Sequence, residues 1–595
     1  MTDFKTILLK DSRLADITDN LAFAVQSGAA NNTFQQFQAV TTSNSSVVFN
    51  IQIPSESIVI DREIVIQTGI TFTLTIPSVA ASTPALIWGQ NAALQAFPFN
   101  KLISTASSTI NNTNVSINEQ DVLDCLLRFN NSRELYRYNG GTPTLPDQAY
   151  LNYSDGVLTN NNPLAGWGSQ SYDIDQAPRG AFPVTFVQGK YVDNLGVVVN
   201  LTSASSFSNT YSVGATTATY TLVFSTQVTE PLFLSPYIFG NPEYNLGGFA
   251  GINTINFVFN IDSTAKRLLS LSSAVGVTGG VPSATIALGN SITGVSNPFA
   301  GGKTQMLMNF LSTQASDLIP SRNVVPYMDY PRYLSNSSAN STITPGAPTT
   351  LQLSSQNIQL NQLPDYFIIV VRKPMSSQTI YDSASFLTIN SISINLNNQS
   401  GLLASATQHD LWKMSVNNNS TQSFDEFFGV ANKTAFGPYA SGSAGTGVPT
   451  PVYTTGSILI LSPSHNLSLP DYLTSSSIGQ FNFQFGINVT SNYSTGAAFA
   501  PEILVICANS GIFVNQAGSS VIYTGILTKQ MVVDTKAEKS ADPVTSAEYK
   551  RMIGGKMNQM NSGAVKKMAQ HLGKKLHLRG AGDGSNSGGK LGKYC

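Results

Sequence analysis

The sequence predicts an all-β protein made of two consecutive units. Charged residues make up only 11% of the 595 residues, whereas Ser, Thr, Asn, Gly, Val and Ile are abundant. Beta-branched residues fit a pleated surface, and Asn, Gly and Pro favour turns. Short segments of alternating polar and apolar residues recur along the chain, and two sequence markers occur once in each half. Because 42% of the residues are apolar, the chain can build hydrophobic cores.

Alternating segments predict the strands of the first unit. The clearest is 69–76, where apolar residues alternate with Thr in the pattern of a half-buried strand. Turn residues separate such short segments, and this density favours sandwiches or jelly rolls over a parallel α/β sheet. The further strands predicted in this unit are 47–53, 182–186, 196–201, 220–224, 252–261 and 306–311.

A second set of strands follows a segment rich in Pro and aromatic residues. The run 367–371 is apolar without interruption, which predicts a strand buried on both faces. Strand signals end after Lys529. The strands predicted in this unit are 366–372, 386–396, 457–461, 480–487, 502–507 and 521–527.

The first marker is a short helix with a predicted capping box. Ser116 precedes Glu119 by three residues, and Ser405 precedes Gln408 in the same way. An apolar helix follows in each half, and Asp121 and Asp410 match at the same offset as the two Ser residues. The helix in the first half is expected to plug one roll with its apolar face and to carry no chemistry.

The second marker supports duplication of a whole unit. Segments 256–261 and 482–487 are similar, and each follows a Leu-Ser-Pro. The spacing between the two markers is much longer in the first half, which predicts a large surface insertion there. Lengthening a surface loop costs little free energy.

These features divide the chain into five parts, of which the last differs in charge. In the tail, basic residues outnumber acidic ones, whereas acidic residues prevail in the rest of the chain, so two regions with different partners are expected. The predicted parts are an N-terminal arm 1–40, a first unit 41–315 with the insertion, a linker 316–349, a second unit 350–530 and a basic tail 531–595.

The sequence offers little for catalysis. Its four His residues are scattered, and none has the Cys/His spacing of a zinc site. Cys125 lies in an apolar helix and is expected to be a core residue. Three Cys residues cannot form a disulfide framework, and neither a signal peptide nor a run of apolar residues long enough for a membrane span is found. We expect no catalytic, metal or cofactor site, and we expect a role in assembly instead of enzyme activity.

Four segments of the first unit carry a resemblance: 58–62 with the Thr-rich strand that follows, 96–99, 108–111 and 116–127. Together they resemble the first jelly roll of major capsid proteins from virophages and Polinton-like viruses. The resemblance implies a double jelly roll: two eight-stranded jelly rolls with short helices and large loop insertions. It further implies homotrimers that form pseudo-hexagonal capsomers of an icosahedral dsDNA virus shell in the virion, with neighbouring capsomers, penton and minor capsid proteins as partners.

The resemblance also gives the basic tail a function. Related viruses carry a maturation cysteine protease that recognises two patterns and cuts after the last residue of each. The first is Met, Ile or Leu, then any residue, then Gly-Gly. The second is Met, Ile or Leu, then any residue, then Gly-x, with Gly following the cut. The tail fits twice, which predicts cleavage between Gly555 and Lys556 and between Ala581 and Gly582.

Before cleavage, segment 563–579 has an apolar and a basic face. It could contact packaged dsDNA without sequence specificity, lie on a membrane, or remain a soluble tail. The basic residues of this face are Lys566, Lys567, Lys574, Lys575 and Arg579. The alternative function for the whole chain is a β-rich viral fibre, tailspike or polysaccharide-binding adhesin, which would need an exposed aromatic and carboxylate groove or short repeats.

Overall fold

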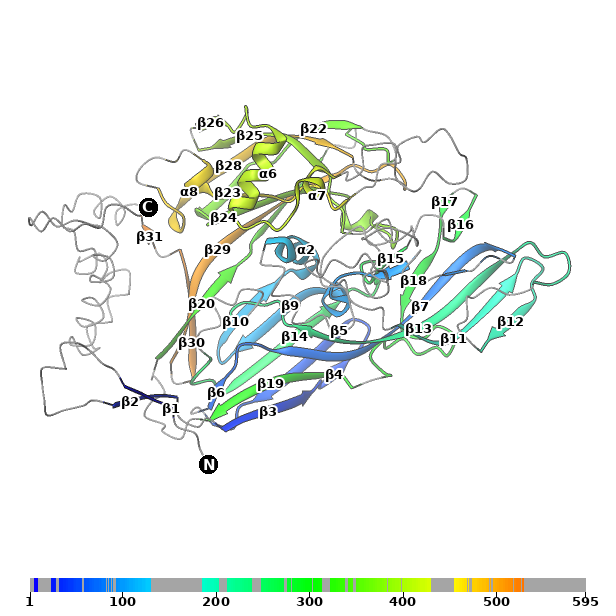
Figure 1. The fold of residues 1–595 in the computed structure, drawn as a ribbon, viewed down its shortest axis with the longest axis horizontal. Helices are drawn as coiled ribbons and strands as arrows, with labels where there is room; N and C mark the ends of the chain where they lie inside the picture. Colours follow the sequence, from blue (N-terminus) through cyan, green and yellow to red (C-terminus); the bar gives the residue numbers. More distant parts are fainter. Residues whose placement is uncertain are drawn as a thin grey trace, which may run out of the picture.

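The computed structural model describes residues 5–8, 23–27, 31–129, 184–312, 322–429 and 454–528, apart from gaps of which 203–210 and 238–247 are the longest. Figure 1 shows two β-rolls, one above the other, with a long extension at one side of the lower roll. None of the helices in the described ranges is long and apolar enough to cross a bilayer. A separate hairpin near the N-terminus pairs β1 (Lys5–Leu8) with β2 (Phe23–Ser27).

The first roll occupies the chain up to residue 312 and is the lower one in Figure 1. One of its two sheets has the strand order β10-β9-β14-β5-β4, and the other has the order β12-β11-β13-β7-β19-β3. Its elements are β3 (Asn31–Gln38), β4 (Thr41–Thr42), β5 (Ser46–Gln52), β6 (Ile58–Ile60), β7 (Val65–Ala80), β8 (Ala92–Leu94), α1 (Pro98–Leu102), β9 (Ile103–Ile110), β10 (Thr113–Ile117), α2 (Glu119–Phe129), β11 (Val184–Asp193), β12 (Val198–Leu201), β13 (Thr217–Pro231), β14 (Thr254–Ile261), β15 (Leu269–Leu271), β16 (Val277–Thr278), β17 (Val281–Pro282), β18 (Thr285–Leu288) and β19 (Gln305–Ser312).

The second roll begins with β20 and lies above the first in Figure 1. Its sheets have the orders β20-β29-β24-β27 and β22-β28-β25-β26. Its elements are β20 (Arg322–Asp329), β21 (Arg332–Asn336), β22 (Thr350–Ser354), β23 (Ile358–Gln362), β24 (Tyr366–Arg372), the 3-10 helix η4 (Met375–Ser377), β25 (Thr388–Leu396), β26 (Gln399–Leu402), α6 (Gln408–Asn417), α7 (Phe424–Phe428), β27 (Leu459–Leu461), α8 (Pro463–Asn466), β28 (Ser477–Thr490), β29 (Glu502–Gln516), β30 (Ser519–Thr524) and β31 (Leu527–Thr528).

The two rolls repeat the same topology. The sheet β10-β9-β14-β5 corresponds to β26-β25-β28-β22, and β13-β7-β19-β3 corresponds to β27-β24-β29-β20. Each roll therefore has four plus four equivalent strands, which confirms the double jelly roll. The markers fall on equivalent elements, because β14 and β28 hold the similar segments and α2 and α6 each follow a hairpin.

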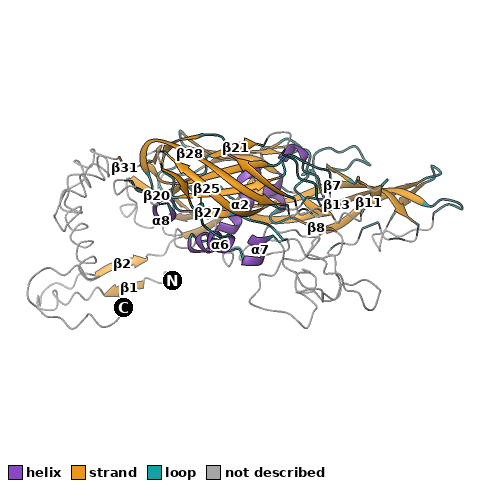
Figure 2. Cartoon of the chain, turned by 90° about the horizontal axis from the view of Figure 1, so that it is seen from above, coloured by secondary structure: helices purple, strands orange, loops and turns teal. Residues whose placement is uncertain are grey.

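The insertion in the first roll lengthens one sheet. β7 has 16 residues and β13 has 15, whereas the equivalent strands β24 and β27 have 7 and 3. The strands β11 and β12 continue this sheet, because β11 pairs with β13 and then with β12. In Figures 1 and 2 the four strands project beyond the body of the molecule.

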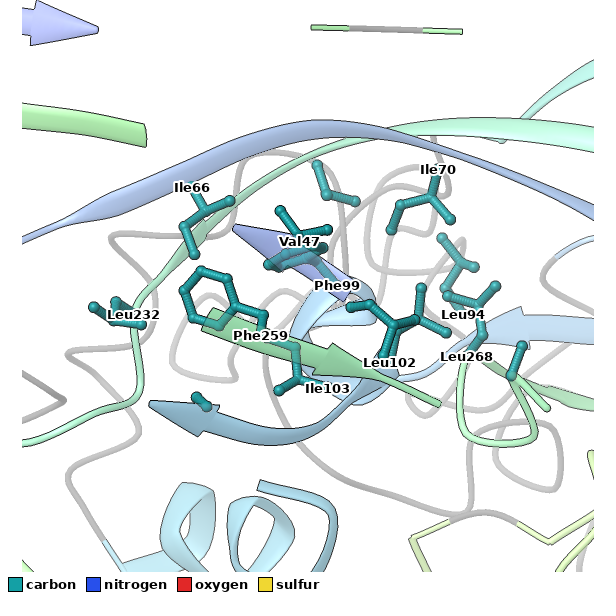
Figure 3. Packing of buried hydrophobic residues seen from close by; sticks show 14 of the residues in the cluster. Val47, Ile66, Ile70, Leu94, Phe99, Leu102, Ile103, Leu232, Phe259 and Leu268 are labelled. Atoms are coloured by element: carbon teal, nitrogen blue, oxygen red, sulfur yellow. The ribbon is translucent and has the colours of Figure 1, made fainter. Parts of the chain in front are cut away.

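The core of the first roll lies between its two sheets and around α1. Figure 3 shows Phe99, Phe259 and Val47 packed between the strands, with Ile66 and Ile70 of β7 above them. Phe99 contacts Phe259 edge to face at a ring distance of 6.1 Å. The core side chains of β5 and β14 alternate along their strands with less buried ones, as the sequence pattern predicted.

The second roll shares one of its sheets with the first. Phe367, Ile369 and Val371 of β24 enter the core of the second roll. Ile368 and Val370, which point the other way, belong to the core cluster of the first. The flanking strands divide in the same manner, with Leu459 and Leu461 on one side and Ile458 and Ile460 on the other. The prediction of a strand buried on both faces is confirmed, and each face of it belongs to a different roll.

The predicted capping boxes were wrong in their residues. In α6 the cap is Thr407, whose hydroxyl accepts from the Asp410 amide while the Asp410 carboxylate accepts from the Thr407 amide at 3.0 Å. In α2 the side chain of Asn118 accepts from the Asp121 amide at 3.2 Å. Both helices thus begin two residues later than the Ser spacing indicated.

Three strands fall inside the stretches that were predicted to be an arm and a linker. β3 lies in the predicted arm, and β20 and β21 lie in the predicted linker, where both pair with β29. Val325 and Tyr327 of β20 pack into the core of the first roll. The division of the chain into five parts stays a prediction.

Candidate functional site: the contact between the two rolls

Helix α2 lies between the rolls and forms ion pairs with the second roll. Its apolar residues pack on the first roll, Val122 and Leu126 in the main core and Leu123 and Leu127 in a small cluster with Phe97 and Phe233. The prediction that this face plugs one roll is therefore confirmed. The burial of Cys125 confirms its core position, and that burial raises the pKa of its thiol.

The other face of α2 reaches the second roll through Asp121. Its carboxylate forms ion pairs with Arg372 of β24 and with Arg332 at the start of β21, the latter at 2.7 Å. Arg372 also pairs with Glu502 of β29 through its Nε atom at 2.7 Å. Burial alone would lower the pKa of Arg372, but the two carboxylates outweigh it and raise the pKa. The sequence did not predict this contact.

A third ion pair and two hydrogen bonds join the end of α2 to the second roll. Arg128 Nη2 lies 2.7 Å from Glu426 Oε1 of α7. The carbonyl oxygen of Arg128 accepts from the amide of Thr421 at 2.8 Å and from its hydroxyl at 2.9 Å. Phe129 then packs edge to face on Tyr366 at a ring distance of 5.2 Å.

Beneath the contact, buried charges of the first roll surround α1 and α2. Asp124 pairs with Lys101 and lies 3.5 Å from Arg267 Nη2. Burial by itself would raise the pKa of Asp124, but Lys101 and Arg267 hold it below its ordinary value. Burial lowers the pKa of Lys101 to about 8. The adjoining cavity, lined by Asp121, Asp124 and Arg267 among others, has room for about one water molecule.

Two further carboxyls in this region are fully buried. Glu230 of β13 accepts from the amides of Phe99 and Asn100 at 2.9 and 3.0 Å. Burial outweighs these hydrogen bonds and raises the pKa of Glu230 to about 7. Neither carboxyl oxygen of Glu119 has a hydrogen-bond partner among the described residues, and burial raises its pKa well above the ordinary value.

A neutral contact joins the rolls at another place. The turn between β29 and β30 reaches the β9–β10 turn of the first roll, where Asn111 Nδ2 donates to Asn515 Oδ1 at 2.9 Å. The amide of Ser520 donates to Asn112 Oδ1 at 2.8 Å. The contact between the rolls therefore combines a shared apolar sheet, a charged helix and a set of amide hydrogen bonds.

The site residues predicted in the tail lie outside the described residues. This holds for the cleavage positions Gly555, Lys556, Ala581 and Gly582 and for the basic residues Lys566, Lys567, Lys574, Lys575 and Arg579. Across the described part of the chain, no group of three or more His, Cys, Asp or Glu residues is arranged to hold a metal ion.

Two family models match the chain, one for each roll. The model described as the Sputnik virophage major capsid protein 1st domain matches residues 2–311, and the Major capsid protein V20 C-terminal domain matches residues 330–511. Among curated proteins, the "Putative capsid protein V20" of Sputnik virophage is 26% identical over 562 residues, covering 92% of this chain and 84% of the relative.

Solved structures show the same fold. The chain in the 3.5 Å cryo-EM structure of the Sputnik virophage has a TM-score of 0.67 and 21% identity, with 92% of this chain and 98% of that chain covered. The mavirus major capsid protein has a TM-score of 0.61 and 15% identity, with 89% and 98% covered. These findings favour a capsid protein over the fibre or adhesin alternative. Because the first-domain model alone matches more than half of the sequence, the chain belongs to the Sputnik virophage major capsid protein family and is a structural component of the virion capsid.

Proposed function

We propose that three copies of the chain form a trimeric, pseudo-hexagonal capsomer of an icosahedral dsDNA virus shell. The observation that carries this proposal is the shared sheet, since β24, β27 and β29 each contribute side chains to the cores of both rolls. Two equivalent rolls joined in this way behave as one block. Threefold symmetry then gives six similar lobes from three chains.

The capsomer acts by assembly and has no catalytic role of its own. Its partners are neighbouring capsomers, penton proteins and minor capsid proteins. The low share of charged residues, 11%, supports many lateral contacts without strong repulsion. Each interface within the trimer buries on the order of 2,000 Å² or more, as obligate assemblies do.

The extension of the first roll forms the larger part of a tower on the outer surface of the capsomer. Its end is rigidly built, because the Asp193 carboxylate accepts from the amides of Leu195 and Val197 at 3.0 and 2.9 Å and also bonds Ser212. Leu195, Val198 and Val213 are exposed there. Contacts between the three towers of a trimer would cover such aliphatic side chains.

The native mass of the purified protein tests the trimer. The expected mass is about 190 kDa, three times the 63.4 kDa of one chain, and it should persist on dilution because obligate interfaces dissociate little. A chain that remains monomeric under all conditions would contradict the proposal.

A viral maturation cysteine protease removes the basic tail. The proposed cuts, after Gly555 and after Ala581, rest on the two sequence patterns. The intact mass of the protein from mature particles measures this directly. Chains that end at Gly555 or Ala581 are expected, and chains that all end at Cys595 would contradict it.

Before cleavage, the basic face of segment 563–579 contacts packaged dsDNA. The support is the grouping of Lys566, Lys567, Lys574, Lys575 and Arg579 beside apolar residues. Such binding releases counterions, so its affinity should fall steeply with salt and should not depend on base sequence. Anionic vesicles in the same titration distinguish a membrane surface as the partner. Equal binding of a chain that lacks residues 531–595 would exclude the tail as the contact.

A further inference from the structure

Two carboxyl groups lie in the interior of the first roll, and none of the residues that the structure describes bonds a cation directly to either of them. Glu119 begins helix α2, Glu230 lies in β13, and both side chains are completely buried. Most buried charged groups in proteins are paired, because an unpaired ion loses its hydration with no compensation. A buried carboxyl without a cationic partner is more stable in its protonated, neutral form.

The partners of Glu230 are hydrogen-bond donors of α1. The amides of Phe99 and Asn100 and the Asn100 side chain at 2.8 Å all donate to its carboxyl oxygens. These donors favour the ionised form, but burial opposes it more strongly, and the pKa stays near 7.

Glu119 has fewer interactions than Glu230 to offset the cost of burying its carboxyl group. Among the described residues nothing donates a hydrogen bond to either of its carboxyl oxygens. The charged groups that face it are Arg267, which favours ionisation, and Glu230, which opposes it. Arg267 lies 3.5 Å from the carboxylate of Asp124, which already neutralises it in part. Glu119 and Glu230 thus repel each other when both are ionised.

We propose that Glu119 and Glu230, two buried carboxyl groups of the first roll, take up protons when this roll folds, so that mild acid stabilises this capsid protein. Glu119 belongs to the helix that joins the two rolls, so its charge state affects the element on which their contact depends.

The direction of the pH effect on stability depends on whether the folded or the unfolded chain binds the proton more tightly. A carboxyl with a higher pKa in the folded chain contributes stability that is fully present at low pH and is lost as the pH rises through the folded pKa. For Glu230 this window runs from 4.5 to about 7, and for Glu119 it also begins at 4.5.

The neighbouring charges change stability outside that window. The pKa of Asp124 is held below 3.8, so its contribution is lost only as the pH falls below 3.8. The pKa of Lys101 is lowered from 10.5 to about 8, so its contribution changes only above that value. Between pH 3.8 and about 8, Glu119 and Glu230 determine how the stability contributed by this cluster changes with pH.

Thermal unfolding of the full chain at about pH 5.5 and about pH 7.5 tests the proposal. The melting temperature should be higher at the lower pH by at least about 2 °C. The Glu119→Gln variant, which copies the protonated shape, should melt higher than the natural protein at the higher pH and should show a smaller difference between the two conditions. Glu63→Gln, the same change at a half-buried surface position, is the matched control and should leave the difference unchanged.

An infrared spectrum supplies a readout that a merely structural role would not move. At neutral pH the natural protein should show the carbonyl stretch of a protonated carboxyl, and Glu119→Gln should lose part of that band. The natural protein alone suffices for this measurement if the variant does not fold. The absence of a protonated carboxyl band, or a melting temperature that falls toward the lower pH equally in both proteins, would overturn the proposal.

Discussion

Helices α2 and α6 occupy equivalent places in the two rolls, yet only α2 is part of the contact between them. Nine of the residues of α2 are buried, whereas in α6 only Leu411 and Ser415 are. The matched residues Asp121 and Asp410 show the difference most clearly. Asp121 binds two arginines of the other roll, and Asp410 caps its own helix at the surface. Duplication supplied the same helix twice, and the packing of one roll on the other gave only one copy a role in assembly.

The largest difference between the helices should come from their aspartates. Replacing Asp121 by Ala leaves Arg372 buried with one carboxylate fewer, and breaking such a buried pair costs about 3–5 kcal/mol. Replacing Asp410 by Ala removes only the carboxylate half of an exposed capping box, because the Thr407 hydroxyl remains, and should cost much less. Urea unfolding of both variants measures the two costs. Equal losses would show that α2 has no special role.

Apolar residues at matched positions should differ by less. Leu127 is fully buried against Phe97 and Phe233, so Leu127→Ala should lower the free energy of unfolding by about 2–5 kcal/mol. The equivalent Val416 of α6 is 38% exposed, and Val416→Ala should change the free energy by no more than about 0.5 kcal/mol. The same urea titrations apply. A large loss for Val416→Ala would indicate that a partner covers α6.

The smallest expected effect concerns the ion pair at the end of α2. Glu426→Gln keeps the capping box of α7, because Gln also accepts from the Ser423 amide, but it removes the charge that faces Arg128. Because Glu426 is partly exposed, the loss should be below about 1 kcal/mol and should disappear in high salt. Unfolding at low and high salt measures it, and a loss that is independent of salt would show that packing, not charge, matters there.

The sequence predicted the fold well where a pattern is local. Alternation identified β7, β14 and β28, and the uninterrupted apolar run 367–371 identified β24 as a strand buried on both faces. The two markers identified the duplication because equivalent strands keep equivalent residues.

The contact between the rolls could not be predicted in the same way. Asp121 and Arg372 are far apart in the sequence, and no spacing links them to each other or to Glu502. The capping residues Asn118 and Thr407 were missed because several polar residues precede each helix and only the backbone geometry selects one. One signal was present, since α2 begins with Glu119, Asp121 and Asp124 in an otherwise apolar helix of a chain poor in charges.

In the proposed capsomer, two similar rolls joined through a shared sheet make one chain count as two lobes. Electron microscopy of the purified trimers tests this arrangement, because class averages along the threefold axis show the lobes. We expect a closed ring of six lobes of similar size. Three well-separated lobes, or particles in which the two rolls of a chain take variable relative positions, would contradict it.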